Sequence, residues 1–417
     1  MIYRQLGRTG LVVSQLGFGA MRMPMKEGDG KQVVDRELAI PMFQRAFEKG
    51  LNYIDTAVGY CNEDSQRVVG EAIKSWTRMK NTASTLVGVI TTPSLEGGGS
   101  TPPNTWYGAE GHSSPHPLVI STKNPYYGED EKEWWTNLEN SLERLGVGSI
   151  DVYNHHGINW KRYTEDVEPR LSKWMQKAKD QGLIKHICSS FHDTNEALVN
   201  LIDTGYVESI TLQYNLLNRE LEPGIAHAKD KNVGIVVMGP VAGGRLGGSS
   251  EVLAKLVPGI GRVPELALRF VLSNPNVTLA LSGMSTLQQV EENTDTASDQ
   301  VSLSGSDLQA IQEHVERLAE MAKLYCTGCK YCMPCEQEVN IPHIFEMYNM
   351  GQVYGLWEIA REDYATFPDS SWIGGKRADE CIECGDCEAK CPQNIQIREQ
   401  LKAAHLALSA RSQVSTS

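Results

Sequence analysis

Residues 118–156 read LVISTKNPYYGEDEKEWWTNLENSLERLGVGSIDVYNHH and contain two apolar segments on either side of an amphipathic one. Leu118–Lys123 and Ile150–His156 have the length and composition of buried strands. Lys132–Leu145 has apolar residues three and four positions apart, which predicts a helix. Two strands joined through a helix run parallel, so this stretch predicts one βαβ unit.

The same alternation continues over the first 300 residues. The other predicted strands are Gln15–Met21, Tyr53–Thr56, Ile184–Phe191, Ser209–Asn215, Gly234–Gly239 and Thr278–Met284. Helical patterns between them include Glu37–Lys49, Ser65–Trp76, Pro264–Leu272 and Leu287–Ala297. Eight strands alternating with helices predict an α/β fold of the (β/α)8 TIM-barrel type. The alternative is a doubly wound open sheet, which the count of eight and the lack of a GxGxxG motif after the first strand disfavour.

Composition limits the function classes. The chain has 417 residues, enough for two domains, and a net charge of −13, which disfavours nucleic acid as a partner. It has no apolar run long enough to span a membrane and no secretory signal, so we expect a cytoplasmic protein. One segment, about 81–117, interrupts the alternation; from Thr91 onward it is rich in Gly, Pro, Ser and Thr and predicts a flexible insertion.

Four ionisable side chains fall at the ends of predicted strands, where TIM barrels hold their chemistry. Asp55 ends the second strand and Tyr60 follows it, while Lys123 and His156 end the third and fourth. A tyrosine has a pKa near ~10, and a lysine ammonium beside it favours the phenolate. Asp55 is expected to hold Lys123, Tyr60 to pass a proton to a carbonyl oxygen, and His156 to orient that oxygen. Each residue alone is equally typical of local hydrogen bonding, so the joint pattern carries the prediction.

Several motifs resemble those of a known family. The chain opens with Arg4-Gln5-Leu6-Gly7-Arg8-Thr9-Gly10-Leu11, and further motifs are Leu16-Gly17-Phe18-Gly19-Ala20-Met21, Asn52-Tyr53-Ile54-Asp55-Thr56-Ala57 with Gly59-Tyr60, Ile120-Ser121-Thr122-Lys123, and Asp151 to His156-Gly157. Over residues 1–300 the chain resembles the aldo-keto reductases, with Asp55, Tyr60, Lys123 and His156 on the catalytic positions. His156 is preferred over His155 because it directly precedes Gly157, and His155 is expected to point to the opposite side of the strand.

The resemblance also implies a nicotinamide cofactor, NAD(P)H, and a small carbonyl or alcohol substrate. It assigns Ser190 to the carboxamide, Met238 to the face of the nicotinamide ring, and Thr211 to a position where relatives carry a carboxamide-binding glutamine. The remaining cofactor-binding positions that it implies are Gly19, Met21, Gly283, Ser285, Gln289, Glu292 and Asn293. Relatives that require NADP often have Lys and Arg where this chain has Gly283 and Gln289, which leaves NAD as an alternative.

Eight of the ten cysteines are crowded into two runs. The second run is Cys381-x2-Cys384-x2-Cys387-x3-Cys391-Pro392, and the first is Cys326-x2-Cys329-x2-Cys332-x2-Cys335. The second has the spacing of bacterial ferredoxins, in which the fourth cysteine serves the other cluster. Two [4Fe–4S] clusters are therefore predicted, one on Cys326, Cys329, Cys332 and Cys391, the other on Cys381, Cys384, Cys387 and Cys335. Two zinc sites are the alternative, although zinc usually uses separated CxxC pairs.

These features predict two domains, a barrel at 1–320 and a mainly helical ferredoxin-type domain at 321–417. The leading hypothesis is a nicotinamide-dependent oxidoreductase whose clusters exchange electrons with a redox protein partner. A second keeps the carbonyl chemistry but makes the clusters structural or redox-sensing, because hydride carries two electrons and each cluster passes one. The third is an electron carrier or redox-responsive protein on a catalytically silent barrel.

Overall fold

The computed structural model describes residues 1–28, 30–87, 114–254, 256–298, 303–323, 330, 332–370, 373–391 and 395–410. The chain forms two compact units, the first made of Met1–Pro240 and Leu268–Ser302, the second of Val241–Ala267 and Leu303–Ser417. Residue 320 lies inside α11 (Gly305–Lys323), within the second unit, so packing divides the chain earlier than the sequence pattern does. None of the described helices is long and apolar enough to cross a membrane.

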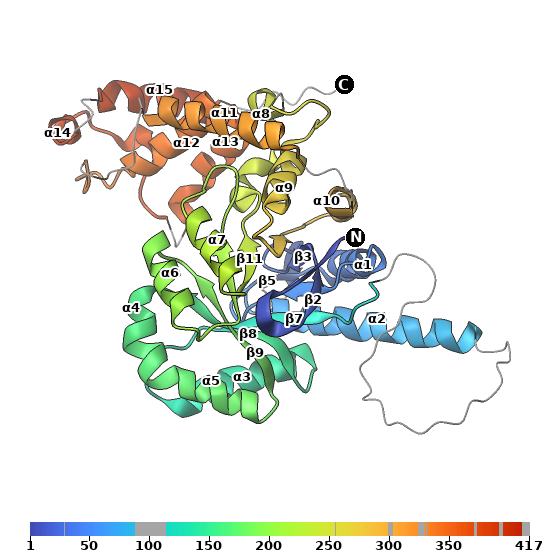
Figure 1. Ribbon diagram of the computed structural model, residues 1–417. Coiled ribbons are helices and arrows are strands. Elements are labelled where there is room, and N and C mark those ends of the chain that lie inside the picture. The colour runs from blue at the N-terminus through green and yellow to red at the C-terminus, as the bar shows by residue number, and fades with distance from the viewer. Residues whose placement is uncertain are drawn as a thin grey trace, which may run out of the picture. The chain divides into compact units, whose positions relative to one another are not determined.

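The first unit is a closed barrel of eight parallel strands, which confirms the predicted TIM-barrel class (Figure 1). Each of the eight predicted strands is present, with both ends within two residues of those expected. In their order around the barrel they are β3 (Leu16–Gly19), β6 (Tyr53–Asp55), β7 (Val119–Asn124), β8 (Ile150–Ile158), β9 (Ile184–Phe191), β10 (Ser209–Gln213), β11 (Gly234–Met238) and β12 (Leu279–Ser282).

Helices surround these strands in Figure 1. They are α1 (Arg36–Glu48), α2 (Ser65–Val87), α3 (Glu131–Leu145), α4 (Trp160–Arg162) continued by a π-helix (Tyr163–Leu171), α5 (Ser172–Asp180), α6 (Asn195–Asp203), α7 (Glu222–Asp230), α9 (Val263–Ser273) and α10 (Leu287–Ser298). The α3 boundaries show why the sequence folds this way: the Asp130 carboxylate accepts from Lys132 N, and Gly146 ends the helix in the left-handed conformation. Its apolar face buries Trp134 and Leu138.

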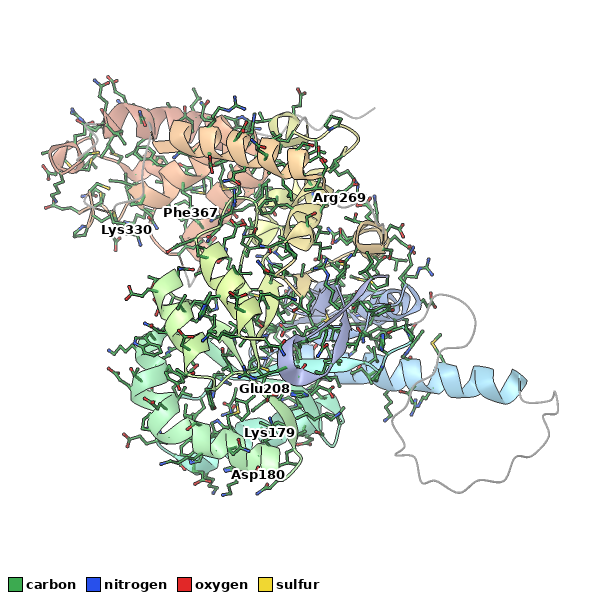
Figure 2. All side chains as sticks on the ribbon, viewed as in Figure 1. Lys179, Asp180, Glu208, Arg269, Lys330 and Phe367 are labelled. Atoms are coloured by element: carbon green, nitrogen blue, oxygen red, sulfur yellow. The ribbon has the colours of Figure 1, made fainter. Side chains whose placement is uncertain are left out.

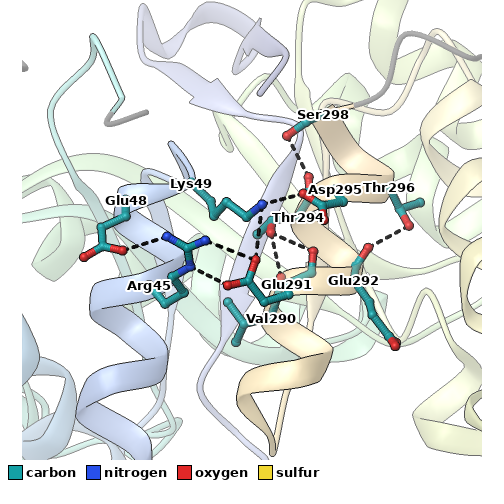
Figure 3. A network of polar contacts seen from close by, with 10 residues as sticks. All are labelled: Arg45, Glu48, Lys49, Val290, Glu291, Glu292, Thr294, Asp295, Thr296 and Ser298. Carbon is teal, nitrogen blue, oxygen red and sulfur yellow. Dashed lines mark hydrogen bonds and ion pairs between the residues drawn. The ribbon is translucent and has the colours of Figure 1, made fainter. Parts of the chain in front are cut away.

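Ion pairs link α1 to α10, the helices that follow the first and last barrel strands (Figure 3). Arg45 and Lys49 contact Glu291, and Lys49 Nζ also lies 2.5 Å from an oxygen of Asp295. On another side of the barrel, Glu208 accepts from Lys179 Nζ at 2.7 Å and from the backbone N–H of Ile187 (Lys179 and Glu208 are labelled in Figure 2). The first set ties two neighbouring helices together, and the second ties α5 to the residue before β10 and to β9.

Two hairpins were not anticipated from the sequence, β1–β2 (Tyr3–Gln5 and Val12–Ser14) and β4–β5 (Met25–Gly28 and Lys31–Val34). The first closes the N-terminal end of the barrel, where Leu6 and Val13 join a buried apolar cluster with Tyr53, Val119, Val152, Cys188, Val236, Leu279 and Leu281. Gly7 sits in this turn at φ +50, and a Cβ there would lie 2.2 Å from Gly234 N. Access to the barrel interior is therefore from the C-terminal ends of the strands.

The expected insertion at about 81–117 needs correction at both ends. Residues 81–87 belong to α2, which continues eleven residues past Trp76 to Val87 because no helix-breaking residue occurs before Gly88. At the other end, Pro117 O accepts from Asn52 Nδ2 at 3.0 Å, and the His116 ring packs edge-on against Tyr3 at 5.0 Å. The rest of the segment, 88–113, lies outside the described residues.

The second unit is mainly helical, as the sequence predicts. Its helices are α8 (Glu251–Ala254), α11, α12 (Ile341–Tyr354), α13 (Trp357–Thr366), α14 (Asp386–Ala389) and α15 (Ile397–Ser409). Its core is formed by buried apolar side chains of α12, α13 and α15, including Ile344, Phe345, Tyr364, Leu401 and Leu408. Phe367, labelled in Figure 2, lies edge-on to His343 with ring centroids 5.1 Å apart.

Candidate active site and metal centre

A buried ion pair lies where β6 and β7 end. Lys123 Nζ is 2.5 Å from Asp55 Oδ2 and donates to Thr56 O at 2.9 Å, while Ser121 Oγ donates to the other oxygen of Asp55 at 2.9 Å. The side chains of Lys123 and Asp55 are 2% and 5% exposed. Charges are stable at that depth only when paired and hydrogen-bonded, so the ammonium is held in one position. Burial acts to lower the pKa of Lys123, but Asp55 and Tyr60 outweigh it and raise that pKa above its usual value.

Tyr60 lies over this pair, with Lys123 Nζ 4.7 Å from the centre of its ring. The ring of His156 meets Tyr60 edge-on, at 84° and a centroid distance of 6.1 Å. Immediately after Tyr60 the chain turns through Cys61, Asn62 and Glu63, all at positive φ, before α2 begins. Such strained backbone is typical of functional loops. The structure thus brings together all four side chains that the sequence singled out.

The two adjacent histidines of β8 have different surroundings. His156 is half-buried, and burial, together with the positive charges of Lys123, His192 and Arg162, lowers its pKa to about 4. It is therefore neutral near pH 7, the state in which an imidazole N–H can donate to a substrate oxygen. His155 is fully buried on the other face, 2.9 Å from Tyr206 Oη, as expected from strand alternation.

Ser190 lies one residue before the end of β9, and Met238 ends β11, with β10 between these two strands. Ser190 Oγ accepts from Gly157 N at 2.8 Å. Thr211, however, does not reach the rim: it pairs with Ser190 and Val236, is buried, and its hydroxyl has no hydrogen-bond partner among the described residues. Gln213, two positions later, ends β10 in register with Met238 and is exposed. Gln213 is therefore the exposed amide at the end of β10, whereas Thr211 is buried in the barrel wall.

The other expected cofactor-binding residues gather where β3 and β12 end. A Cβ on Gly19 would lie 3.4 Å from Ser282 O and 3.5 Å from Gly283 N, so these two strand ends are close. Ser285 N donates to Gln289 Oε1 at 2.7 Å, and Asn293 Nδ2 donates to Ser282 Oγ at 3.0 Å. Glu292 Oε1 accepts from Gln288 at 2.8 Å, and Met21 is 57% exposed. Most of these residues are partly or fully exposed, whereas Asn293 is buried.

In the second unit, one cavity is lined by cysteines from both runs: Cys332, Cys335, Cys381, Cys384 and Cys387. Cys326 and Cys329 lie outside the described residues, and Cys391 does not line the cavity. Glu383 and Gly385 adopt positive φ, which curls the 381–387 loop around the cavity. Lys390 and Arg398 also line it. Within the described part of the chain, no three Cys, His, Asp or Glu side chains are grouped to hold a single metal ion.

This donor set fits an iron–sulfur cluster. Thiolates are the ligands of such clusters, and five cysteines line this one cavity. The four residues Cys335, Cys381, Cys384 and Cys387, which the spacing assigns to one cluster, share this cavity. Cys332 lines it too, although the spacing assigns that residue to the other cluster.

Comparison with known proteins agrees with the geometry. The model of the aldo/keto reductase family matches residues 15–316. The chain belongs to the aldo/keto reductase family. It is an oxidoreductase of this type with a C-terminal iron–sulfur region, because a 4Fe-4S dicluster domain matches residues 325–395.

Relatives and solved structures cover the barrel of this aldo/keto reductase. An uncharacterized oxidoreductase of Schizosaccharomyces pombe is 29% identical over 70% of this chain and 84% of its own. The NADH-specific methylglyoxal reductase of Escherichia coli is 24% identical over 75% of this chain and 98% of its own. A solved aldo-keto reductase from Bacillus halodurans, in its holo form, is 24% identical with a TM-score of 0.56, covering 75% of this chain and 96% of its own.

Proposed function

We propose that this protein transfers hydride between a nicotinamide cofactor, NAD(P)H, and a small carbonyl or alcohol substrate. The observation that carries the proposal is the buried Asp55–Lys123 pair beneath Tyr60, with a neutral His156 at the edge of the same ring. Buried ion pairs with nearby titratable groups are common at catalytic sites, and proton transfer to a substrate oxygen would account for this one.

The residues divide the work as follows. Tyr60 Oη gives its proton to the carbonyl oxygen as negative charge develops there, and Lys123 stabilises the phenolate that remains. Asp55 is a positioning residue that fixes the lysine. His156 donates a hydrogen bond to the same oxygen and orients it. When bound, the nicotinamide would supply the hydride to the adjacent carbon.

The rim residues would hold that cofactor. Ser190 and Gln213 offer polar side chains for the carboxamide, and Met238 offers an apolar one for the ring. Gly19, Met21, Gly283, Ser285, Gln289, Glu292 and Asn293 would line the remainder. The Escherichia coli relative is named for methylglyoxal and another, from Arabidopsis thaliana, is named L-galactose dehydrogenase, which supports small oxygenated substrates.

For the second unit we propose two [4Fe–4S] clusters, with Cys326, Cys329, Cys332 and Cys391 on one and Cys381, Cys384, Cys387 and Cys335 on the other. The clusters would exchange electrons with a redox protein partner in the cytoplasm, where thiols stay reduced. We keep the domain division near residue 320, since the two family models match on either side of it, at 15–316 and 325–395.

The test is Tyr60→Phe, made and assayed anaerobically. We expect kcat for a small aldehyde to fall by about 10²–10⁴, while iron content and nicotinamide affinity stay unchanged. Tyr3→Phe is the matched control, because Tyr3 Oη donates to Gly50 O, remote from the four catalytic positions. Turnover that survives Tyr60→Phe would contradict the catalytic assignment. If the wild-type protein reduces no carbonyl but still cycles electrons through its clusters, it is an electron carrier.

A further inference from the structure

Two basic side chains lie beside the residue that follows His156. A Cβ at the position of Gly157 would lie 3.5 Å from Arg162 Nη1 and 4.0 Å from His192 Cδ2. Arg162 ends α4, and His192 comes directly after β9, so the two side chains reach this point from different segments of the chain. Both are exposed to solvent. They therefore stand where a substrate held by His156 would extend away from its reacting oxygen.

Arg162 is fixed in place and still has donors to offer. Its Nη1 donates to Gly157 O at 2.7 Å, and its guanidinium lies 4.6 Å from the centre of the Tyr127 ring. Its backbone N–H donates to Asn159 Oδ1 at 2.8 Å. A guanidinium has five N–H donors, so one bond to a carbonyl oxygen leaves others available. The arginine is thus pre-oriented for a further acceptor.

The charge of Arg162 is not balanced by a carboxylate. It forms no ion pair with any residue that the structure describes. Asp193, the acidic neighbour of His192, is engaged by backbone donors, since its two oxygens accept from Trp160 N at 2.9 Å and Thr194 N at 2.8 Å. The chain as a whole has a net charge of −13, so a free positive charge at this place is a local feature that attracts anions.

The histidines beside Arg162 report the same excess of positive charge. Burial lowers the pKa of His156 to about 4, with further contributions from the charges of Lys123, His192 and Arg162. Burial, Lys123 and Arg162 also lower the pKa of His192. His192 is therefore neutral near pH 7 and offers a hydrogen bond without a second charge. One guanidinium beside one neutral imidazole matches a singly charged carboxylate better than a doubly charged phosphate.

We propose that Arg162, assisted by His192, binds a carboxylate group of the substrate, so that the protein acts on aldehydes or ketones that carry an acid group and on the matching hydroxy acids. The inference rests on the proposed function and names the substrate class for that site. Arg162 is a specificity-determining residue, because no bond forms or breaks at the carboxylate. Hydride still passes from the nicotinamide to the carbonyl carbon, and the proton still passes from Tyr60 to the oxygen.

The test compares 4-oxobutanoate with its neutral methyl ester as substrates of the intact, cluster-loaded protein at saturating nicotinamide. Arg162→Gln keeps a donor for Gly157 O and removes the charge. We expect kcat/KM for the acid to fall by about 10- to 100-fold, the range for loss of a charge-assisted contact, mainly through KM. The value for the ester should change less than about twofold, since the ester makes no such contact. Calorimetric titration with 4-hydroxybutyrate, the reduced form of the acid, should show the same loss without turnover.

Lys161→Gln is the matched control. Lys161 is the neighbouring cation of α4, its side chain is 78% exposed, and its ion pair with Glu165 spans 3.9 Å, so its loss should leave both substrates unaffected. An equal loss for acid and ester in Arg162→Gln would mean that the arginine only supports Gly157, and would overturn the inference. Equal use of acid and ester by the wild type, or reduction of the ester alone, would also overturn it and leave the proposed function standing. No turnover of either aldehyde would contradict the proposed function, and the inference with it.

Discussion

The two candidate sites of this chain are built in different ways. In the barrel, Asp55 and Lys123 lie at strand ends, are almost fully buried, and are fixed by hydrogen bonds with Ser121 Oγ and Thr56 O. In the second unit, none of the six described cluster cysteines is buried, Cys384 is exposed, and most lie in irregular loops. The barrel site is held by hydrogen bonds between neighbouring barrel strands and the residues that follow them.

This difference indicates whether each site is formed by the protein alone or only with its bound group. A strand end is positioned by its neighbours on both sides, so the catalytic group is complete without a ligand. Four thiolates repel one another and are stable together only around a metal centre. We therefore expect the second unit to depend on its clusters for stability and the first to be independent of them.

Removal of the iron is expected to have the largest effect, and it tests whether only the second unit depends on its clusters. Hydrogen exchange followed by mass spectrometry on iron-loaded and iron-free protein should show loss of protection in 332–410 and retention in β6–β9. The stabilisation at stake is on the order of 10 kcal/mol, as for small domains that fold around thiolate-bound metal. If 332–410 stays protected without iron, the cysteine cavity is as pre-formed as the barrel site.

Lys123→Met should break the pre-formed site itself. It leaves the Asp55 carboxylate buried without its cation, which costs about 3–5 kcal/mol of barrel stability. Adding Asp55→Asn should recover most of that loss, since no charge is then buried, while activity stays absent. Urea denaturation followed by tryptophan fluorescence measures both. A double variant as unstable as the single one would mean that packing, and not charge, sets the cost.

The stability of the barrel in acid is a further test, because the buried His155 lies next to the catalytic His156 in β8. Burial lowers its pKa to about 3 in the folded state, while the unfolded chain protonates near 6.5. The unfolded state therefore takes up the proton first, and stability falls as pH drops below 6.5, by about 1.4 kcal/mol per pH unit for each such histidine. His156, with a pKa of about 4, adds to the slope.

His155→Gln should accordingly flatten the pH dependence of the urea midpoint between pH 6 and 5 in part, since His156 and His192, whose pKa values burial also lowers, remain. The measurement is a series of urea titrations at fixed ionic strength. An unchanged slope would show that protonation of His155 does not limit barrel stability in acid.

The smallest effect is expected at the surface, where Arg45 and Lys49 contact Glu291 (Figure 3). Arg45 and Glu291 are 39% and 36% exposed, so water and salt screen the pair. Glu291→Gln should cost about 1 kcal/mol or less at low salt and almost nothing in 1 M NaCl. A larger or salt-independent loss would mean that α1 and α10 depend on these charges as the buried pair does.

The sequence predicted the barrel well because many buried parallel strands are short apolar runs, such as Gly234–Met238. It missed the β1–β2 hairpin because strands of three residues leave too short a pattern. It did not single out Gln213, although the predicted strand Ser209–Asn215 includes it, because composition does not reveal which side chain of a strand is exposed.

The cysteine spacing predicted a metal centre, and the fold brings Cys335 to the second run, as that spacing requires. The positions of Cys326 and Cys329 lie outside the described residues. The pairing of four cysteines with each cluster therefore remains a prediction, because spacing identifies which residues are ligands more readily than which cluster each one serves.

The burial of Lys123 has a practical consequence. An amine that is enclosed by Asp55, Thr56 O and the Tyr60 ring is shielded from acylating reagents, whereas most lysines of this chain are exposed to them. Under brief acetylation, Lys123 should be modified last, and only in molecules whose barrel has opened. Its acetylated fraction, read from a single peptide, would serve as an internal gauge of how much of a preparation is correctly folded.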